Sequence, residues 1–200
     1  MTPVKSVEAL DAAYGAANPK SLTKVAKAMT PLYRKWIEAS RFVVLTTVGP
    51  EGTDGSPRGD AGPVVRIADD GTLLLPDWLG NNRIDSLRNI VRDGRVSLMF
   101  MVPGSNNVVR VNGTAIVTMD DEACAEFERK GKRPRSVIVA TIGEMYFQCA
   151  KAVMRAQIWS GVDESADLPS AGDFLKEAHE EFDAKAYDDG YPEHARARMW

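Results

Sequence analysis

Hydrophobic residues follow two different periods along this chain. Between residues 21 and 39 they recur every three or four positions, which predicts amphipathic helix, and Pro31 divides the stretch into two helices with Thr30 capping the second. Further along, β-branched and aromatic residues gather in short runs that are typical of strands. We expect strands at residues 42–48, 64–68, 72–75, 95–102, 108–119 and 136–147.

The segments between these runs predict how the strands connect. Asp69-Asp70-Gly71 indicates a hairpin turn because glycine tolerates a positive φ angle, whereas residues 49–62 hold five glycines and two prolines and are expected to form a loop. Asn112-Gly113 permits a tight turn or a glycine bend within one long strand, and the local chemistry slightly favours the turn. Helices are expected at residues 82–93, from Asp120 or Asp121 to Lys130, and at 149–155 and 173–186.

Hairpin connections and a single helical crossover indicate one antiparallel sheet. About six strands with short helices between them predict an α+β, mainly β fold of barrel-like architecture, rather than a doubly wound parallel sheet. A length of 200 residues suits one such domain with appendages.

Composition excludes several classes of protein. Apolar residues make up 44% of the chain and charged residues 26%, which is ordinary for a globular protein and unlike a disordered chain, a collagen or a coiled coil. The apolar runs at 42–46 and 96–102 are too short to cross a bilayer as helices, and the first ten residues do not resemble a secretory signal. With only Cys124 and Cys149 as cysteines, we expect a reduced, cytoplasmic protein with no membrane partner.

Charge is divided unevenly along the chain. Residues 163–200 hold 11 acidic and four basic side chains and net −7, whereas residues 1–162 hold 21 basic and 17 acidic side chains and net +4. An acidic tail on a mildly basic body indicates a solvated extension, and the body could bind anions. Nucleic acid is not favoured as a partner, because the basic residues are scattered and no aromatic–basic motif accompanies them.

Conventional catalytic machinery is missing from the sequence. His179 and His194 are the only histidines and both lie in the acidic tail, and neither a His-x-x-x-His nor a Cys-x-x-Cys pair occurs. We therefore expect no metal site and assign no catalytic residue. An enzyme of this composition would take its difficult chemistry from a cofactor.

One candidate anion site lies between Pro76 and Arg83. Asn81 or Asn82 can cap the following helix, whose first amides are unpaired donors. An arginine at a helix start opposes the helix dipole by about 0.3–1 kcal/mol, and a bound phosphate with Arg83 as its counter-ion would resolve this conflict. The alternative is an exposed arginine that pairs with Asp77 or Asp85.

Two further segments combine cations with flexible or helical backbone. Arg58 and Asp60 lie among glycines, where the backbone can approach a ligand closely, although a solvent-exposed loop would have the same composition. Lys151 and Arg155 are four residues apart on one predicted helix face, where they repel unless an anion or an acid lies between them. The alternative for this pair is a solvated basic face.

Several short segments recur in a fixed order along the chain: Arg58-Gly59-Asp60, Leu75-Pro76-Asp77, residues 80–87, Pro103-Gly104 and residues 110–113. Taken in this order, they resemble the FMN-binding split barrel of the pyridoxamine 5′-phosphate oxidase-like superfamily, and more closely a subgroup of bacterial FMN-dependent flavoproteins. The similarity covers residues 42–159, about three-fifths of the chain.

The resemblance implies an antiparallel six-stranded split β-barrel with peripheral helices. We place an N-terminal helical extension at 1–40, the FMN-binding barrel at 41–160 and an acidic C-terminal helical tail at 161–200. It also implies a homodimer with FMN at the subunit interface.

The resemblance also implies roles for the candidate site residues. Arg58, Asn82 and Arg83 would hold the FMN phosphate. Pro76 and Asp77 would lie along the flavin, and Asp60 and Asp77 would bond its ribityl chain or ring edge. The residues expected to approach FMN from the partner subunit are Lys151, Arg155 and Trp159.

The function implied is an FMN-dependent oxidoreductase that transfers a hydride or electrons through the flavin, with a small-molecule substrate or a nicotinamide donor as its partner. The alternative is a non-catalytic FMN-, F420- or haem-binding, redox-sensing module on the same fold. Two departures leave the substrate open and keep us from assigning vitamin B6 oxidation. The acidic tail lacks the arginine-rich ending of pyridoxamine phosphate oxidases, and Gln148 stands where the subgroup tends to have histidine.

Overall fold

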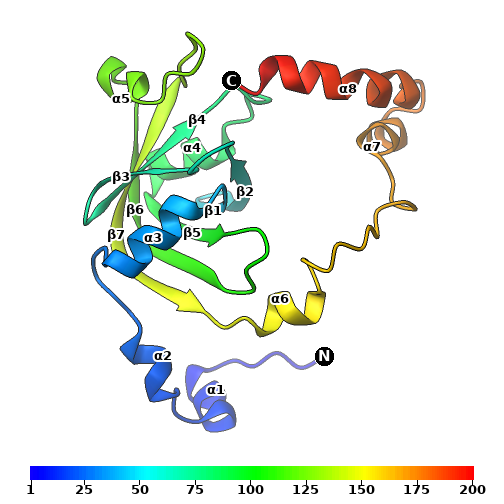
Figure 1. The fold of residues 1–200 in the computed structure, drawn as a ribbon. Helices are drawn as coiled ribbons and strands as arrows, with labels where there is room; N and C mark the ends of the chain where they lie inside the picture. Colours follow the sequence, from blue (N-terminus) through cyan, green and yellow to red (C-terminus); the bar gives the residue numbers. More distant parts are fainter.

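The computed structural model describes residues 1–200, in which one antiparallel sheet of seven strands curves around a hydrophobic core (Figure 1). The strand order is β2-β1-β5-β6-β7-β4-β3, and the two ends of the sheet do not pair, so the barrel is split. This confirms the mainly β, antiparallel split barrel with peripheral helices, with one strand more than the six predicted. The strands are β1 (Phe42–Gly49), β2 (Gly52–Gly59), β3 (Arg66–Asp69), β4 (Thr72–Asp77), β5 (Arg95–Met101), β6 (Val108–Thr118) and β7 (Ser136–Gln148).

The additional strand is β2, which occupies the glycine-rich segment predicted to be a loop. Its backbone pairs with β1 along its whole length, from Gly49↔Gly52 to Phe42↔Gly59. The edge of β1 supplies hydrogen-bond partners that composition does not reveal, and an edge strand tolerates both glycine and Pro57. The loop prediction for 49–62 was therefore wrong.

Asn112 and Gly113 lie inside the continuous strand β6. The tight turn that the local chemistry slightly favoured was therefore wrong, and the alternative, a bend within one long strand, is what the structure shows. The β6–β7 register shifts between these two residues, as in a β-bulge. A Cβ atom on Gly113 would lie 1.9 Å from the carbonyl oxygen of Thr141, so this close approach requires glycine. The hairpin between β3 and β4 is confirmed, but Gly71 does not adopt a positive φ angle, and its N–H instead donates to Asp69 Oδ1 at 2.7 Å.

Eight helices surround the barrel, and Thr30 caps α3 as predicted by accepting from the Tyr33 N–H at 3.4 Å. Two expected helices differ in extent. The helix expected at 173–186 is broken at His179, which has extended backbone, and the one expected to reach Lys130 ends at Ala125. The helices are α1 (Val7–Tyr14), α2 (Pro19–Thr23), α3 (Pro31–Ala39), α4 (Asp85–Arg92), α5 (Asp121–Ala125), α6 (Lys151–Ala156), α7 (Ala171–Ala178) and α8 (Ala184–Arg198).

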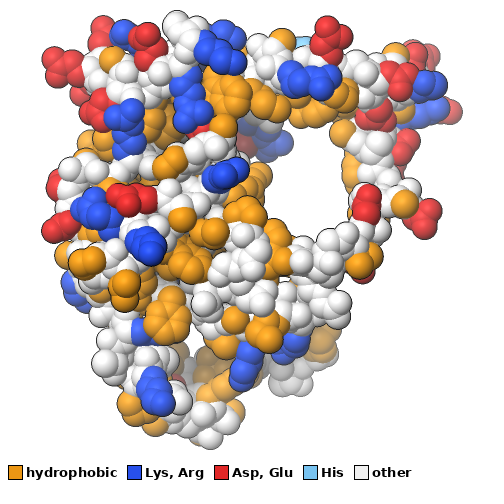
Figure 2. All heavy atoms as spheres, viewed as in Figure 1, with side chains coloured by type: hydrophobic (Ala, Val, Ile, Leu, Met, Phe, Trp, Pro, Cys, Tyr) orange, Lys and Arg blue, Asp and Glu red, His pale blue; other side chains and the backbone are white.

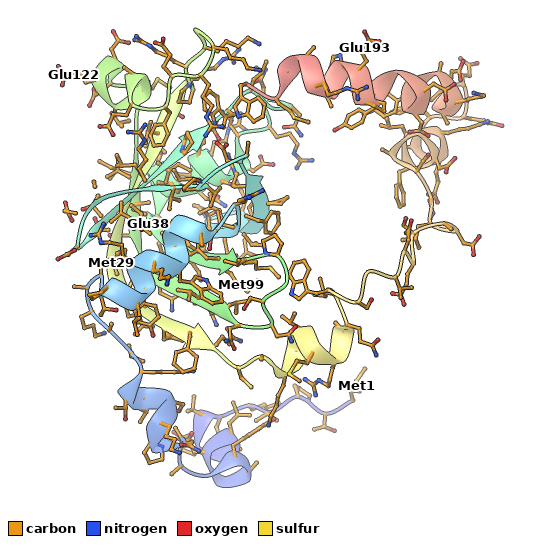
Figure 3. The ribbon with its side chains drawn as sticks, viewed as in Figure 1. Met1, Met29, Glu38, Met99, Glu122 and Glu193 are labelled. Atoms are coloured by element: carbon orange, nitrogen blue, oxygen red, sulfur yellow. The ribbon has the colours of Figure 1, made fainter.

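The core fills the inside of the barrel and is closed by helices. It contains 19 buried residues, to which α3 contributes Ile37 and α4 contributes Ile90. Met29, just before α3, is also buried there (Figure 3). Within α4, Asn89 donates a buried hydrogen bond to Thr47 Oγ1 at 3.1 Å, which fixes the helix against β1. The start of α4 is therefore held beside the split in the barrel.

Residues 161–200, called the C-terminal arm below, stand apart from the barrel. In Figure 1, α7 lies away from the sheet and α8 runs back towards it, so that the chain ends near the barrel. No helix in the structure combines the length and apolar character needed to cross a membrane.

Candidate functional site

A cavity of about 810 Å³ opens where the barrel is split. Its walls are β2, the end of β4 with the following loop, and the start of α4, and Arg135 and Ser136 complete it at the start of β7. This volume lies within the usual range of ligand-binding sites. The split between unpaired strand edges therefore forms a cleft large enough for a cofactor.

Successive side chains of β2 point to opposite faces of the sheet, and three polar side chains on one face point into the cleft. Asp54, Ser56 and Arg58 line it, and they pair in register with inward-facing positions of β1. Arg58 Nε donates to Ser56 Oγ at 3.1 Å, and the Arg58 guanidinium forms an ion pair with Asp77 at the end of β4. Both charged side chains are about four-fifths buried, so this ion pair bridges the two sides of the split.

The loop before α4 has an unusual backbone. Asn82 and Ile84 both have positive φ angles, of 61° and 53°, and Asn81 Oδ1 accepts from the Arg83 N–H at 3.1 Å. The helix consequently begins only at Asp85, and no side chain caps it. The expected cap by Asn81 or Asn82 was wrong, because Ile84 occupies that position and leaves the first helix amides available.

Arg83 projects from this loop with its side chain 77% exposed. Its Nε donates to Asp85 Oδ2 at 2.8 Å, so of the two carboxylates considered as partners the structure selects Asp85. Asp77 pairs with Arg58 instead.

Arg135 and Trp78 also line the cleft and were missed by sequence reasoning. Arg135 Nη1 donates to Asn82 Oδ1 at 3.3 Å and forms no ion pair, in contrast to Arg58 and Arg83. The Trp78 indole N–H is buried and has no hydrogen-bond partner. The pairing Asp77↔Ser136 between β4 and β7 brings residues 78 and 135 together, and no local pattern signals this pairing.

Asp60 lines the cleft but its carboxylate is already occupied. It pairs with Arg129 at 2.6 Å, and its own side chain is only 4% exposed. Arg129 also lies over the ring of Trp200, 5.7 Å from the ring centroid. Asp60 therefore connects the cleft to the end of the C-terminal arm.

The candidate residues divide into two groups in space. Those that line the cleft are Arg58, Asp60, Pro76, Asp77, Asn82 and Arg83. Lys151, Arg155 and Trp159 do not line the cleft of their own chain. The Trp159 indole N–H donates to the carbonyl of Ser105 at 2.7 Å, and no acid of the same chain pairs with Lys151 or Arg155.

The chemistry that the cleft can perform follows from its lining. Guanidinium groups, amide groups and free helix amides can bind an anionic, hydrogen-bonding ligand. The lining contains no histidine, cysteine, lysine or tyrosine. The arrangement is therefore suited to binding and orienting a ligand, and aspartates are its only acidic or basic side chains besides the arginines.

An antiparallel split barrel with a polar cleft in its opening defines the class of this protein. The sequence profile described as pyridoxamine 5′-phosphate oxidase matches residues 29–149, more than half of the chain. The chain therefore belongs to the pyridoxamine 5′-phosphate oxidase family.

Solved structures that are similar to this chain include two bacterial proteins. A variant of HupZ from Group A Streptococcus is 17% identical with a TM-score of 0.50, and the match covers 60% of this chain and 98% of that one. An FMN-binding protein from Syntrophomonas wolfei is 12% identical with a TM-score of 0.43, over 72% of this chain and 97% of that one. No curated protein matches the chain.

Proposed function

We propose that this chain binds FMN in the cleft and acts as an FMN-dependent oxidoreductase on a small-molecule substrate. The main support is the cleft in the split of a pyridoxamine 5′-phosphate oxidase family barrel. This cleft is lined by Arg135, which has no carboxylate partner, and by Trp78, whose indole N–H has no hydrogen-bond partner. A buried donor without an acceptor is costly, so a ligand that accepts from Trp78 would stabilise the site.

The phosphate would be held by Arg135, Asn82 and Arg83. Arg135 and Asn82 are joined by a hydrogen bond, and the positive φ angles on either side of Arg83 leave the first amides of α4 uncapped. Together these groups offer positive charge and N–H donors to one anion. Arg135 would contribute more than Arg83 to the binding free energy of the phosphate, because Arg83 must first be released from its ion pair with Asp85.

The Arg58–Asp77 ion pair, with Pro76 and Asp60, would lie along the ribityl chain and the ring edge. The ion pair is held at the opening of the barrel, where it can offer both a donor and an acceptor to a polar ligand. Removing either partner would leave the other charge unpaired and four-fifths buried.

Bound FMN supplies reversible transfer of one or two electrons to the site. The side chains of this chain would bind and orient the flavin and the substrate, and the rigid barrel would keep the arginine charges in place. A nicotinamide donor or the substrate itself would then enter beside the flavin from the open side of the cleft.

A homodimer with FMN at the interface completes the proposal. Phe42 and Val44 on β1 pair in register with Met101 and Met99 on β5, and they alternate with core residues, so they form an apolar outer face of the sheet. A second copy would cover this face. Lys151, Arg155 and Trp159, which have no role in the cleft of their own chain, would then approach FMN from the partner.

A non-catalytic binding module is the second candidate. The observation that favours it is the cleft lining, which lacks histidine, cysteine, lysine and tyrosine and so lacks the usual proton-transfer groups. FMN, F420 or haem could occupy such a module.

Extraction and mass spectrometry of the cofactor that copurifies with the full chain is the first test. Titration with FMN and riboflavin, followed by anaerobic mixing with NADH and NADPH, is the second. We expect a yellow protein that binds FMN and whose flavin is bleached by a nicotinamide donor. Protein with neither flavin absorption nor affinity for FMN would refute the proposal, and bound flavin that no donor reduces would favour the binding module.

A further inference from the structure

The segment between α5 and β7 contains the most basic stretch of the chain. Five of the seven residues from 129 to 135 are lysine or arginine, and none is acidic. The stretch begins with a tight turn, in which the backbones of Arg129 and Lys132 exchange two hydrogen bonds of 2.9 Å, and Lys130 and Gly131 have positive φ angles of 50° and 75°. Residues paired in this way carry their side chains on the same face. Arg129 and Lys132 therefore extend in the same direction from one turn.

Arg129 reaches from this turn to the cleft. Its Nη1 lies 2.6 Å from Oδ1 of Asp60, which lines the cleft and whose side chain is only 4% exposed. The same oxygen accepts from the Gly62 N–H at 3.4 Å, whereas no hydrogen bond within the chain reaches Oδ2. A buried carboxylate needs a compensating cation, and Arg129 is the only one that pairs with Asp60. Arg129 therefore determines which oxygen of Asp60 is left for a ligand in the cleft.

The end of the C-terminal arm is attached to the same turn. Lys132 Nζ donates to the carbonyl oxygens of Ala197 at 3.4 Å and Trp200 at 2.6 Å, where a cation is also favoured by the dipole of α8. The Arg129 guanidinium lies over the Trp200 ring, 5.7 Å from its centroid, within the range of a cation–π contact. Apart from contacts between near neighbours along the chain, no other hydrogen bond joins the arm to the barrel. Figure 2 shows an opening between the barrel and the middle of the arm, so the attachment depends on this turn.

We propose that the end of the C-terminal arm, residues 197–200, is a latch that raises the flavin affinity of the cleft, with Arg129 as the positioning residue between them. The inference rests on the proposed function, in which Asp60 lies along the ribityl chain and the ring edge of the flavin. While the arm is attached, Trp200 and Asp60 both restrain the Arg129 guanidinium. When the arm is released, Arg129 gains rotational freedom and the buried Asp60 carboxylate is less often paired.

This coupling has two consequences. If attachment of the arm strengthens flavin binding by some factor, then bound flavin strengthens attachment of the arm by the same factor. Because Asp60 would contact the flavin away from its phosphate, the latch affects FMN and riboflavin equally. The proposed phosphate site around Arg135 distinguishes these two ligands, so the two effects can be separated.

The first test compares the dissociation constants of FMN and riboflavin for the full chain, measured by flavin fluorescence. The latch variant combines Lys132→Gln with Trp200→Ala, and neither residue lines the cleft or belongs to the core. We expect this variant to raise both dissociation constants by the same factor, about three- to tenfold. Arg129→Gln should raise both by about tenfold or more, and Arg129→Lys should restore part of the loss.

Arg133→Gln is the matched control. Arg133 belongs to the same basic stretch, but it pairs with Glu128 and contacts neither Asp60 nor the arm. We expect this variant to bind both flavins as the wild-type chain does.

Hydrogen exchange of the α8 amides tests the latch in the absence of flavin. The amides near the end of α8 should exchange faster in the latch variant. They should also exchange faster in Asp60→Asn, in which the arm is unchanged but Arg129 has lost its ion pair. Added riboflavin should slow the same amides in the wild-type chain. Exchange in α8 that does not respond to Asp60→Asn overturns the coupling.

The outcomes separate the latch from the proposed function. If the wild-type chain binds flavin and both the latch variant and Arg129→Gln bind it equally well, the latch is overturned and the proposed function stands. A loss of affinity for FMN alone also overturns the latch, because it indicates a contact with the phosphate. A wild-type chain without affinity for either flavin overturns the proposed function, and exchange in α8 then decides whether the arm and Asp60 are coupled.

Discussion

The two arginines of the proposed phosphate site, Arg135 and Arg83, are expected to contribute unequally to FMN binding. Arg135→Gln should weaken FMN binding more than Arg83→Gln, although the sequence analysis assigns Arg83, and not Arg135, to the phosphate. The reason is that Arg135 bonds only the neutral amide of Asn82, whereas Arg83 already pairs with Asp85 at 2.8 Å.

The magnitudes follow from these partners. A hydrogen bond to a charged group stabilises by about 1.5–3 kcal/mol, and Arg135 is itself exposed, so loss of the Arg135 contact should raise the dissociation constant by about tenfold, the lower end of this range. Arg83 is 77% exposed and would exchange one ion pair for another. Exposed ion pairs contribute about 0–1 kcal/mol, so Arg83→Gln should cost at most about fivefold.

The assay is titration of flavin fluorescence with each variant at fixed ionic strength, first with FMN and then with riboflavin. Riboflavin lacks the phosphate, so its affinity should be nearly the same in the wild-type chain and in Arg135→Gln. Equal losses for FMN and riboflavin would refute a phosphate contact by Arg135. A larger effect of Arg83→Gln than of Arg135→Gln would refute the argument from existing ion pairs.

Three further predictions concern the barrel itself. Asp77→Asn removes the ion pair across the split and leaves its arginine partner unpaired, so thermal unfolding should show a loss of about 1–3 kcal/mol; an unchanged Tm would contradict this. Gly113→Ala should destabilise by about 1–3 kcal/mol or more because its Cβ meets a backbone carbonyl at 1.9 Å. Gly55→Ala, with nothing within 4 Å, is the control, and equal effects would refute the bulge constraint. Cys149 is exposed and should react rapidly with a maleimide, whereas Cys124 is buried and burial raises the pKa of its thiol, so mass spectrometry should find one label per folded chain.

Local patterns were sufficient to predict most strands, one hairpin and one helix cap. The run that became β1, the hairpin at Asp69–Gly71 and the cap at Thr30 depend on residues within a few positions of one another. The order of motifs along the chain was also sufficient to indicate the family. These features share one cause, because side-chain period, turn chemistry and capping act over single turns and strands.

Only some residues of the candidate site could be predicted from the sequence. The sequence singled out Arg58, Asn82 and Arg83, and the structure brings them into one cleft. It could not indicate that Arg135 joins them, because Arg135 is more than 50 residues from Asn82 and reaches it only through the pairing of β4 with β7. Nor could it indicate that Arg58 is bound to Asp77 across the split.

By itself, the sequence determined the strand-rich antiparallel class, the family and the division into a basic body and an acidic arm. Tertiary structure alone decided that residues 52–59 form a strand, that Asn112-Gly113 is a bulge and that the arm stands off the barrel. The physical reason is that hydrogen-bond partners across a sheet, close backbone contacts and ion pairs depend on which distant segments become neighbours. The residues of a segment determine its charge and polarity. The segment that it contacts is determined only when the barrel closes around its core.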